Sequence, residues 1–232
     1  LNAAQDFENP QDGNTDNQYL VTIQADDGTN QSTQEVLVDI TDVNEAPSFS
    51  SGDSSLQNEN TTTTGYVAAA TDPEGATLTY SIPNTGADQG KFNIDPTTGT
   101  LTFLTPPDAE NPTDADGQND YVVDIQVSDG QNTSVQTVTV DVSDINEAPE
   151  FGNTNTLSIA EGATSPTLQA SVTDPEGDSI TWSIVGGADL SKFGISSSGE
   201  LSLNAAQDFE HPQDGNTDNQ YLVTTQADDG TT

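Results

Sequence analysis

The sequence repeats itself at intervals of about 100 residues, and this restricts the fold to a tandem array of small domains. Residues 1–29 and 203–231 differ at only two of 29 positions. A more divergent copy lies between them, and Tyr19, Tyr121 and Tyr221 occupy the same position in the three copies, with spacings of 102 and 100 residues. A repeat of this length is a domain and not one turn of a solenoid.

Two DxNEAP segments, DVNEAP at 42–47 and DINEAP at 144–149, predict where the repeats are divided. Residues 1–46 would be the C-terminal half of one repeat with its linker. Residues 47–148 would be a complete repeat, and residues 149–232 a repeat that lacks its last strand. We therefore expect the sequence to be a segment of a longer array.

The complete repeat has the residue pattern of an all-β fold. Tyr121, Val123, Ile125 and Val127 alternate with more polar residues, which is the period of two of a half-buried strand. Trp182 lies at a comparable alternating position, so we expect it to fill a core. No segment has a sustained helical period. About seven short strands per repeat, separated by turn residues, predict a two-sheet sandwich.

Charge limits the partners of this chain. It has 39 acidic residues against two lysines and no arginine, a formal net charge of −37. Phosphates would be repelled, so we expect no nucleic-acid partner and no anionic membrane surface, whereas cations would be attracted. Cysteine is absent and histidine occurs once, which disfavours disulfides and zinc or copper sites. No apolar run approaches the roughly 18 residues of a membrane span, so we expect no membrane insertion by this segment.

The acidic residues gather in motifs that suit calcium, which takes six to eight oxygen ligands. Asp108 and Glu110 stand one residue apart in a DxE motif, and can point at the same ion if both lie in a loop. In the second linker, Asp144 and Glu147 flank Asn146, and a proline follows. This pattern predicts a hinge made of ligands, which is loose without ions because its carboxylates repel one another and is rigid with ions bound.

The order of the motifs is similar to that of the cadherin repeat. Glu59 is followed by DPE at 72–74, FNIDPTTGTL, DAE at 108–110, YVVDIQVSDG and DINEAP. The resemblance covers the whole chain, and the acidic insertion after DxE looks like the cadherin-like tandem repeats of large bacterial cell-surface adhesins. The resemblance implies tandem immunoglobulin-like Greek-key β-sandwiches with Ca²⁺ at the junctions between repeats. The family typically holds three ions per junction.

The resemblance also implies which residues hold the calcium ions. At the second linker they are Glu59, Asp108, Glu110, Asp144, Asn146, Glu147, Asp174, Glu176 and Asp229. At the first linker they are Asp6, Glu8, Asp42, Asn44, Glu45, Asp72, Glu74 and Asp129. A third junction would use Glu161, Asp208 and Glu210.

Two further features offer metal-binding side chains. Asp114, Asp116 and Asp120 in the insertion resemble half of an EF-hand loop, but the closing Glu is absent, so we interpret the insertion as a polar surface turn. His211 replaces an asparagine in a nearly identical copy, and we interpret it as surface variation.

These observations predict a calcium-dependent cell-adhesion or extender module of a larger extracellular, membrane- or envelope-anchored protein. Its expected partners are calcium and either another copy of the array or a cell-surface glycan or protein. The alternative is a carbohydrate- or surface-binding module of a secreted protein, but aromatic residues are only 6% of the chain and most fall at core-facing positions. An enzyme is disfavoured, because the sequence has no evident nucleophile–base set.

Overall fold

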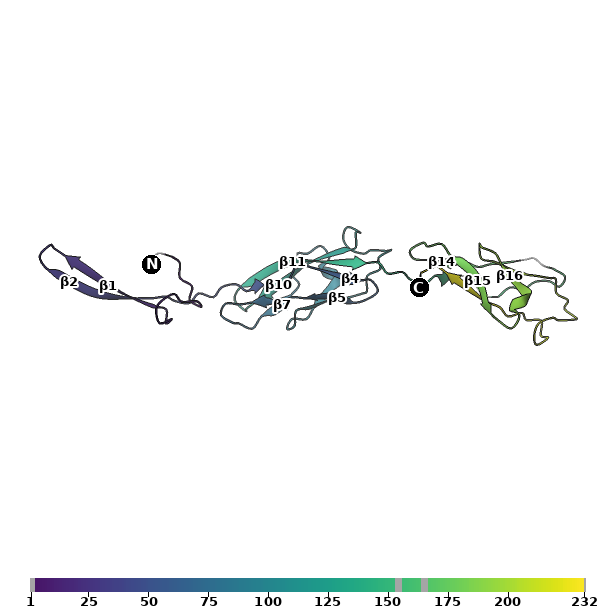
Figure 1. Cartoon of the computed structure of the whole chain (residues 1–232), viewed down its shortest axis with the longest axis horizontal. Helices are drawn as coiled ribbons and strands as arrows, with labels where there is room; N and C mark the ends of the chain where they lie inside the picture. Colours follow the sequence, from purple (N-terminus) through teal and green to yellow (C-terminus); the bar gives the residue numbers. More distant parts are fainter. Residues whose placement is uncertain (1–2, 153–155, 164–166, 232) are drawn as a thin grey trace. The chain divides into compact units, whose positions relative to one another are not determined.

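The computed structural model describes residues 3–152, 156–163 and 167–231, and its regular structure is almost entirely β. The chain divides into two compact units, Leu1–Asp144 and Ile145–Thr232 (Figure 1). Within the described ranges, the helical segments are two short 3₁₀ turns, Gln89–Lys91 and Leu190–Lys192. No helix in that part of the chain is long and apolar enough to cross a membrane.

The first unit contains one complete set of sandwich strands. They are β3 (Ser48–Phe49), β4 (Ser54–Asn58), β5 (Thr63–Val67), β6 (Ala70–Thr71), β7 (Thr79–Ser81), β8 (Phe92–Ile94), β9 (Thr100–Phe103), β10 (Asp120–Ser128) and β11 (Thr133–Ser143). If β3 and β4 are counted as one interrupted strand, and β5 and β6 as another, the repeat has seven strands. This agrees with the expected number.

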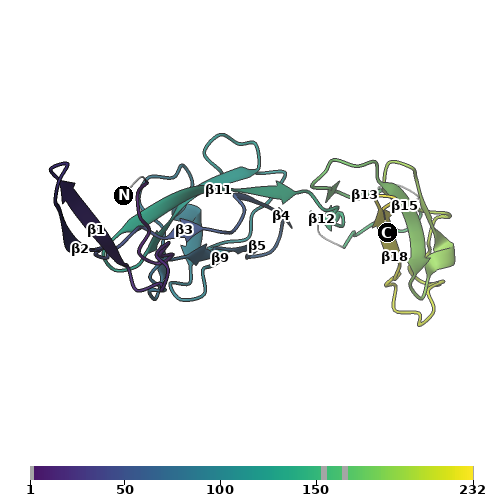
Figure 2. The same ribbon diagram turned by 60° about the vertical axis from the view of Figure 1, so that its left-hand side comes forward.

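These strands form two facing sheets. One has the order β4-β11-β10-β7, the other β5-β9-β8, and β3 pairs with β6. Figure 2 shows β5 and β9 below β11. The five-residue strand β4 runs parallel to the last strand of the repeat, β11, whereas β10 and β11 are antiparallel. This arrangement confirms the predicted all-β, immunoglobulin-like sandwich.

The alternation read from the sequence determines which face of β10 is buried. Tyr121, Val123, Ile125 and Val127 are at most 1% exposed, and the residues between them are partly exposed. Burying side chains of this size contributes roughly 1.5–3 kcal/mol each. The period of two therefore sets the register of β10 against the core, because a shift by one residue would expose the whole set.

An aromatic cluster joins the two sheets. Phe92 of β8 stacks on Phe103 of β9 at 4.8 Å between ring centroids, and Phe103 meets Tyr121 of β10 edge-to-face at 5.2 Å. Such pairs add about 0.5–1.5 kcal/mol beyond burial. The Tyr121 hydroxyl also accepts a hydrogen bond from the backbone N–H of Thr113 at 3.3 Å. The core is thereby linked to the acidic insertion.

The first unit also contains a hairpin before the linker. Strands β1 (Gln18–Asp26) and β2 (Gln31–Asp39) pair antiparallel. Tyr19 opposes Val38 in this hairpin, just as Tyr121 opposes Val140 between β10 and β11. The repeated sequence therefore gives the same strand register in both copies.

The second unit reproduces most of the same pairings. Its strands are β12 (Glu150–Phe151), β13 (Leu168–Gln169), β14 (Val172–Thr173), β15 (Thr181–Gly186), β16 (Phe193–Ile195), β17 (Glu200–Leu203) and β18 (Thr224–Asp228). The order β13-β17-β16 and the pairs β15-β18 and β12-β14 match β5-β9-β8, β7-β10 and β3-β6. Trp182 packs edge-to-face on Phe151 at 5.9 Å, but it is half-buried, so the expectation that it fills a closed core holds only in part.

Candidate cation-binding site at the first linker

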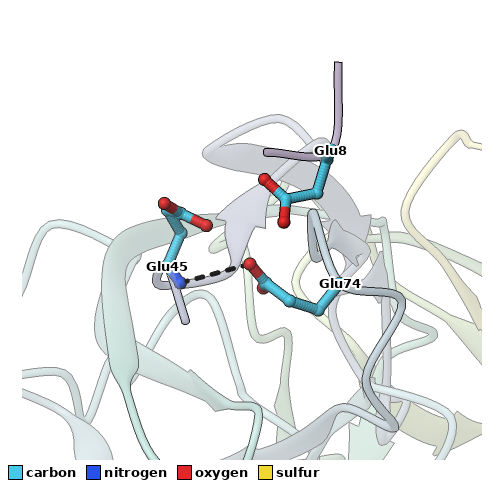
Figure 3. Close-up of side chains that lie close together, drawn as sticks. All are labelled: Glu8, Glu45 and Glu74. Atoms are coloured by element: carbon cyan, nitrogen blue, oxygen red, sulfur yellow. Dashed lines mark hydrogen bonds between the residues drawn. The ribbon is translucent and has the colours of Figure 1, made fainter. Parts of the chain in front are cut away.

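Three glutamates from distant segments meet within the first unit. Glu8 comes from the DxE motif before β1, Glu45 from the first linker and Glu74 from the loop after β6 (Figure 3). One carboxylate oxygen of each lies within 4.8 Å of the others. Three like charges at this separation repel one another, unless a proton or a cation is shared among them.

The DPEG turn holds Asp72 and Glu74 in position. The N–H of Gly75 donates to the carbonyl of Asp72 at 3.1 Å, and the N–H of Ala76 donates to Asp72 Oδ1 at 3.0 Å. The other oxygens, Asp72 Oδ2 and Glu74 Oε2, are buried and have no hydrogen-bond partner among the described residues. A buried carboxylate oxygen without a partner is costly, so these atoms fit a role as ligands of a hard cation.

Hydrogen bonds hold the linker against the loops that follow it. The side-chain N–H of Asn44 donates to Asp129 Oδ2 at 2.6 Å, and Asn132 Nδ2 donates to the carbonyl of Asn44 at 2.8 Å. The backbone N–H of Glu45 donates to Glu74 Oε1 at 3.4 Å. The hydrogen bond from Asn44 is the main reason that the pKa of Asp129 is lowered.

The cluster perturbs the protonation of two glutamates. The pKa of Glu45 is raised to about 7, first by the hydrogen bond its carboxyl shares with Glu74, then by desolvation and the charges of Glu74 and Glu8. The pKa of Glu8 is raised chiefly by desolvation, and also by the charges of Asp42 and Glu74. Raised pKa values in grouped carboxyls mean that the metal-free cluster favours a bound proton, which a cation would displace.

The structure therefore brings together only part of the first predicted ligand set. Glu8, Glu45 and Glu74 form the cluster, and Asp42 lies near enough to Glu8 to raise its pKa. Asp6 lies outside the group of three and accepts a hydrogen bond from the N–H of Asn9 at 3.0 Å.

The ligands predicted for the second linker are divided between the two units. Those in the first unit form another acidic cluster. Carboxylate oxygens of Glu59, Glu110 and Asp144 lie within 4.8 Å of one another. Glu59 is only 2% exposed, and its Oε2 accepts a hydrogen bond from the N–H of Ala109 at 2.7 Å. Asp108 Oδ1 accepts one from the N–H of Asn111 at 2.9 Å. The buried Glu59 thus holds the DxE loop in place.

The remaining members of the second set repeat the geometry of the first linker inside the second unit. Asn146 Nδ2 donates to Asp229 Oδ2 at 2.9 Å, and the N–H of Glu147 donates to Glu176 Oε1 at 3.3 Å. Asp174 Oδ2 and Glu176 Oε2 are buried and lack a hydrogen-bond partner in the described ranges. The assembly of the two parts of this set into one site stays a prediction.

The insertion contains a further acidic group. Oxygens of Asp114, Asp116 and Asp120 lie within 4.8 Å of one another. Asp114 is only 8% exposed and accepts hydrogen bonds from the N–H groups of Gln118 and Asn119 at 2.9 and 3.3 Å. The predicted polar turn is therefore present, but its first acid is a buried acceptor and not a solvated side chain.

Sequence reasoning missed the residue that anchors this insertion. Asp88 is 5% exposed, and its two carboxylate oxygens accept hydrogen bonds from the N–H groups of Ala115 and Val122 at 2.7 and 2.8 Å. Asp189 makes the equivalent pair of bonds in the second unit, both at 2.9 Å. The signal available in the sequence was an Asp three residues before the KF pair in both copies.

The third predicted set lies together in the second unit. Glu161, Asp208 and Glu210 have carboxylate oxygens within 4.8 Å of one another. His211 is on the surface, as expected, but its Nδ1 lies 3.2 Å from Asp208 Oδ2. The one histidine of the chain therefore contacts a predicted ligand, a role that the sequence reasoning did not assign.

Comparisons with known proteins agree with the fold and the motifs. A family model for the bacterial Ig domain matches residues 44–142. Human Protocadherin Fat 1 is 33% identical over 71% of this chain and 4% of that protein, and human Protocadherin-15 is 39% identical over 46% of this chain and 5% of that protein. The chain thus spans a small part of each of these relatives.

The solved structures that resemble the chain include human Protocadherin-24 EC1-2. Its form II structure has a TM-score of 0.49 and 23% identity, and the match covers 79% of this chain and 86% of that one. The family assignment rests on the sequence matches. Together with the motif order and the observed sandwich, they confirm the predicted resemblance: the chain is built of cadherin-like, immunoglobulin-like repeats.

Proposed function

We propose that the chain is a calcium-dependent adhesion or extender module, in which Ca²⁺ bound at the linkers makes the array rigid. The observation that carries the proposal is the meeting of Glu8, Glu45 and Glu74. They come from a segment before the linker, from the linker itself and from a loop after it. An ion held by all three would connect these segments through one coordination shell.

The donor set favours calcium over other cations. The side chains at the first linker offer carboxylate and amide oxygens, and Asp72 Oδ2 and Glu74 Oε2 are buried oxygens without a hydrogen-bond partner among the described residues. Calcium accepts six to eight such oxygens at about 2.3–2.6 Å in flexible geometry. Magnesium requires near-ideal octahedral geometry and keeps several waters. The ligands proposed for the first linker are those predicted from the sequence: Asp6, Glu8, Asp42, Asn44, Glu45, Asp72, Glu74 and Asp129.

Calcium would change the mechanics of the chain through electrostatics. Without an ion, the three glutamates repel one another across the linker. A bound ion replaces this repulsion with attraction to every ligand, so the arrangement that holds the ligands together becomes the stable one. Binding to the folded state alone stabilises it by about 2.7 kcal/mol at a hundredfold excess of free ligand over Kd.

The relatives support the biological setting that we propose. Those reported above are protocadherins, and the matched bacterial Ig domain supports a bacterial version of such a repeat. We place the module at the cell surface of a larger anchored protein. Its partner would be a second copy of the array or a cell-surface glycan or protein, and its role is binding and not catalysis.

Calorimetric titration of calcium into the whole chain tests this proposal. Glu45→Gln should weaken binding at the first linker by tenfold or more, because it removes a charged ligand. Glu35→Gln is the matched control, since Glu35 is an exposed residue of β2 and should bind calcium like the parent. Equal isotherms for both variants would refute the first-linker site.

A further inference from the structure

An asparagine with the same backbone conformation closes the acidic insertion in all three copies of the repeat. Asn17, Asn119 and Asn219 have φ of +62°, +65° and +65°. Residues other than glycine rarely adopt this left-handed conformation, and asparagine is one of the few that tolerate it. None of the three is among the ligands proposed for calcium, so metal ligation does not explain the shared conformation.

The side chain of each asparagine donates a hydrogen bond to the backbone of a DxE motif. Asn119 Nδ2 donates to the carbonyl of Ala109, the middle residue of that motif, at 2.8 Å. The same bond measures 2.8 and 3.0 Å in the other two copies, where it joins Asn17 to Phe7 and Asn219 to Phe209. The contact therefore recurs at one position of the repeat in both compact units.

The amide of this asparagine acts as a donor and not as an acceptor. The carbonyl of Ala109 can only accept a hydrogen bond, so the nitrogen of Asn119 must face it. Oδ1 of Asn119 is buried without a hydrogen-bond partner among the described residues, and so is Oδ1 of Asn17. A buried amide oxygen without a partner is costly. The bond to the DxE backbone is thus made in two copies despite this cost, which argues that it is a built feature.

The backbone of Asn119 joins the same position to the strand that leads into the linker. Its carbonyl accepts a hydrogen bond from the N–H of Val142 in β11 at 2.9 Å, and Asp144 follows two residues later. The equivalent bond in the first copy runs from the N–H of Ile40 to the carbonyl of Asn17 at 3.0 Å. One residue thereby fixes the DxE motif relative to the start of the linker.

This arrangement bears on the carboxylate cluster formed by Glu59, Glu110 and Asp144, whose oxygens lie within 4.8 Å of one another. Glu110 belongs to the DxE motif, and Asp144 directly follows β11. Asn119 joins the two segments that carry these acids. Residues that orient metal ligands in this way typically change metal affinity 10–100-fold when they are substituted.

We infer that the asparagine closing the insertion is a positioning residue of the cation site, which holds the DxE motif in place against the strand that enters the linker. Asn119 does this for Glu110, and Asn17 does it for Glu8. The acidic insertion then contributes to calcium binding through these hydrogen bonds. The effect on calcium affinity rests on the proposed function, whereas the fixing of the DxE backbone does not.

Calcium titration of the whole chain, followed by the backbone amide signals of Glu8 and Glu110, tests the effect on each site. Asn119→Gly removes the amide but suits the left-handed backbone. The affinity reported by Glu110 should therefore fall about tenfold or more, and the affinity reported by Glu8 should not change. Asn17→Gly should give the reverse result.

Ile125→Val is the control for general destabilisation. Ile125 is fully buried, and this change typically costs about 0.5–1.5 kcal/mol, but it touches neither DxE motif. It should leave both affinities unchanged. A loss of affinity in Ile125→Val equal to that in the glycine variants would overturn the inference, because stability and not positioning would then explain the loss. Glycine variants that bind calcium like the parent would overturn it as well.

Backbone ¹⁵N relaxation in excess EGTA tests the positioning without calcium. The N–H of Ala109 should have an order parameter of about 0.85 in the parent, as in rigid backbone, and of less than about 0.6 in Asn119→Gly. An order parameter that Asn119→Gly leaves unchanged would overturn the inference. A parent that binds no calcium would contradict the proposed function, and the order parameter of Ala109 would still decide whether Asn119 holds the motif.

Discussion

The backbone N–H of Glu45 donates a hydrogen bond to Oε1 of Glu74 across 3.4 Å, which joins the linker to a turn 29 positions further along the chain. The same bond recurs between Glu147 and Glu176 at 3.3 Å. Each turn therefore carries an acid whose one oxygen binds the linker backbone, while its other oxygen is buried without a hydrogen-bond partner in the described part of the chain. One oxygen of each carboxylate thus positions the linker and the other is left for an ion, which supports the proposed calcium site.

Calcium affinity should fall as pH falls through about 7. The pKa of Glu45 is raised to about 7 from its usual 4.5, mainly by the hydrogen bond shared with Glu74. In the metal-free protein this raised pKa adds stability that is fully present below pH 4.5 and is lost as pH rises through about 7. Calcium must displace that proton, so apparent affinity at the first linker should be about tenfold weaker at pH 6 than at pH 8.

Calorimetry in two buffers with different ionisation enthalpies measures the proton release directly. At pH 7 the parent should release protons on binding calcium, and Glu45→Gln should release fewer. An affinity that is flat between pH 6 and pH 8, without proton release, would contradict the assignment of Glu45 as a ligand.

Asp88→Ala should destabilise the complete repeat, although Asp88 lies outside both linkers. The buried carboxylate accepts two backbone N–H groups, from Ala115 and Val122, and its removal leaves both donors unsatisfied at a cost of about 2–4 kcal/mol. Urea unfolding measures the loss. Asp53→Ala is the control, since Asp53 is an exposed loop residue and should cost less than about 0.5 kcal/mol. Equal losses would mean that the insertion is not anchored by Asp88.

Gly99→Ala should be poorly tolerated in the turn between β8 and β9. Gly99 has φ of +71°, and an added Cβ would lie 2.3 Å from the carbonyl oxygen of Ala68. The left-handed backbone alone costs about 1–2 kcal/mol for an L-residue, and the contact with Ala68 adds to it. Gly52→Ala is the matched control, because no atom of the described residues lies within 4 Å of the added Cβ. Similar melting temperatures for the two variants would contradict this account of the turn.

Sodium chloride should raise the melting temperature even when calcium is saturating. Residues 48–149 contain 16 acidic residues and one lysine, so their net charge is −15. Three bound calcium ions would reduce this charge to −9. Repulsion of this size is screened as the Debye length falls from about 30 Å at 0.01 M to about 3 Å at 1 M. A melting temperature that stays flat or falls over this range would show that the remaining acids are already paired or well separated.

The fold was predictable because its determinants are local and repeated. The alternation of Tyr121 to Val127 gave both the strand and its buried face. Asp88 could not be identified in this way, since its role depends on contacts with residues 27 and 34 positions away. The half-burial of Trp182 was also missed, because alternation indicates which face turns inward but not how completely the facing sheet covers it.

The sequence predicted the kind of site, a cluster of carboxylates at the linker, but only some of the residues that form it. The resemblance to the cadherin repeat brought Glu8, Glu45 and Glu74 into one hypothesis, and the structure places them together. The sequence could not reveal that Asn44 donates to Asp129, because an amide presents either a donor or an acceptor and its neighbours decide which one. It also gave no sign that Asp6 is engaged by the N–H of Asn9.

A crystal structure of the chain grown with saturating calcium tests the central claim most directly, with the ions identified by their anomalous signal. The account predicts an ion at the first linker with carboxylate oxygens of Glu8, Glu45 and Glu74 at about 2.3–2.6 Å. Density without an ion at that position, with the three carboxylates turned toward solvent, would contradict it.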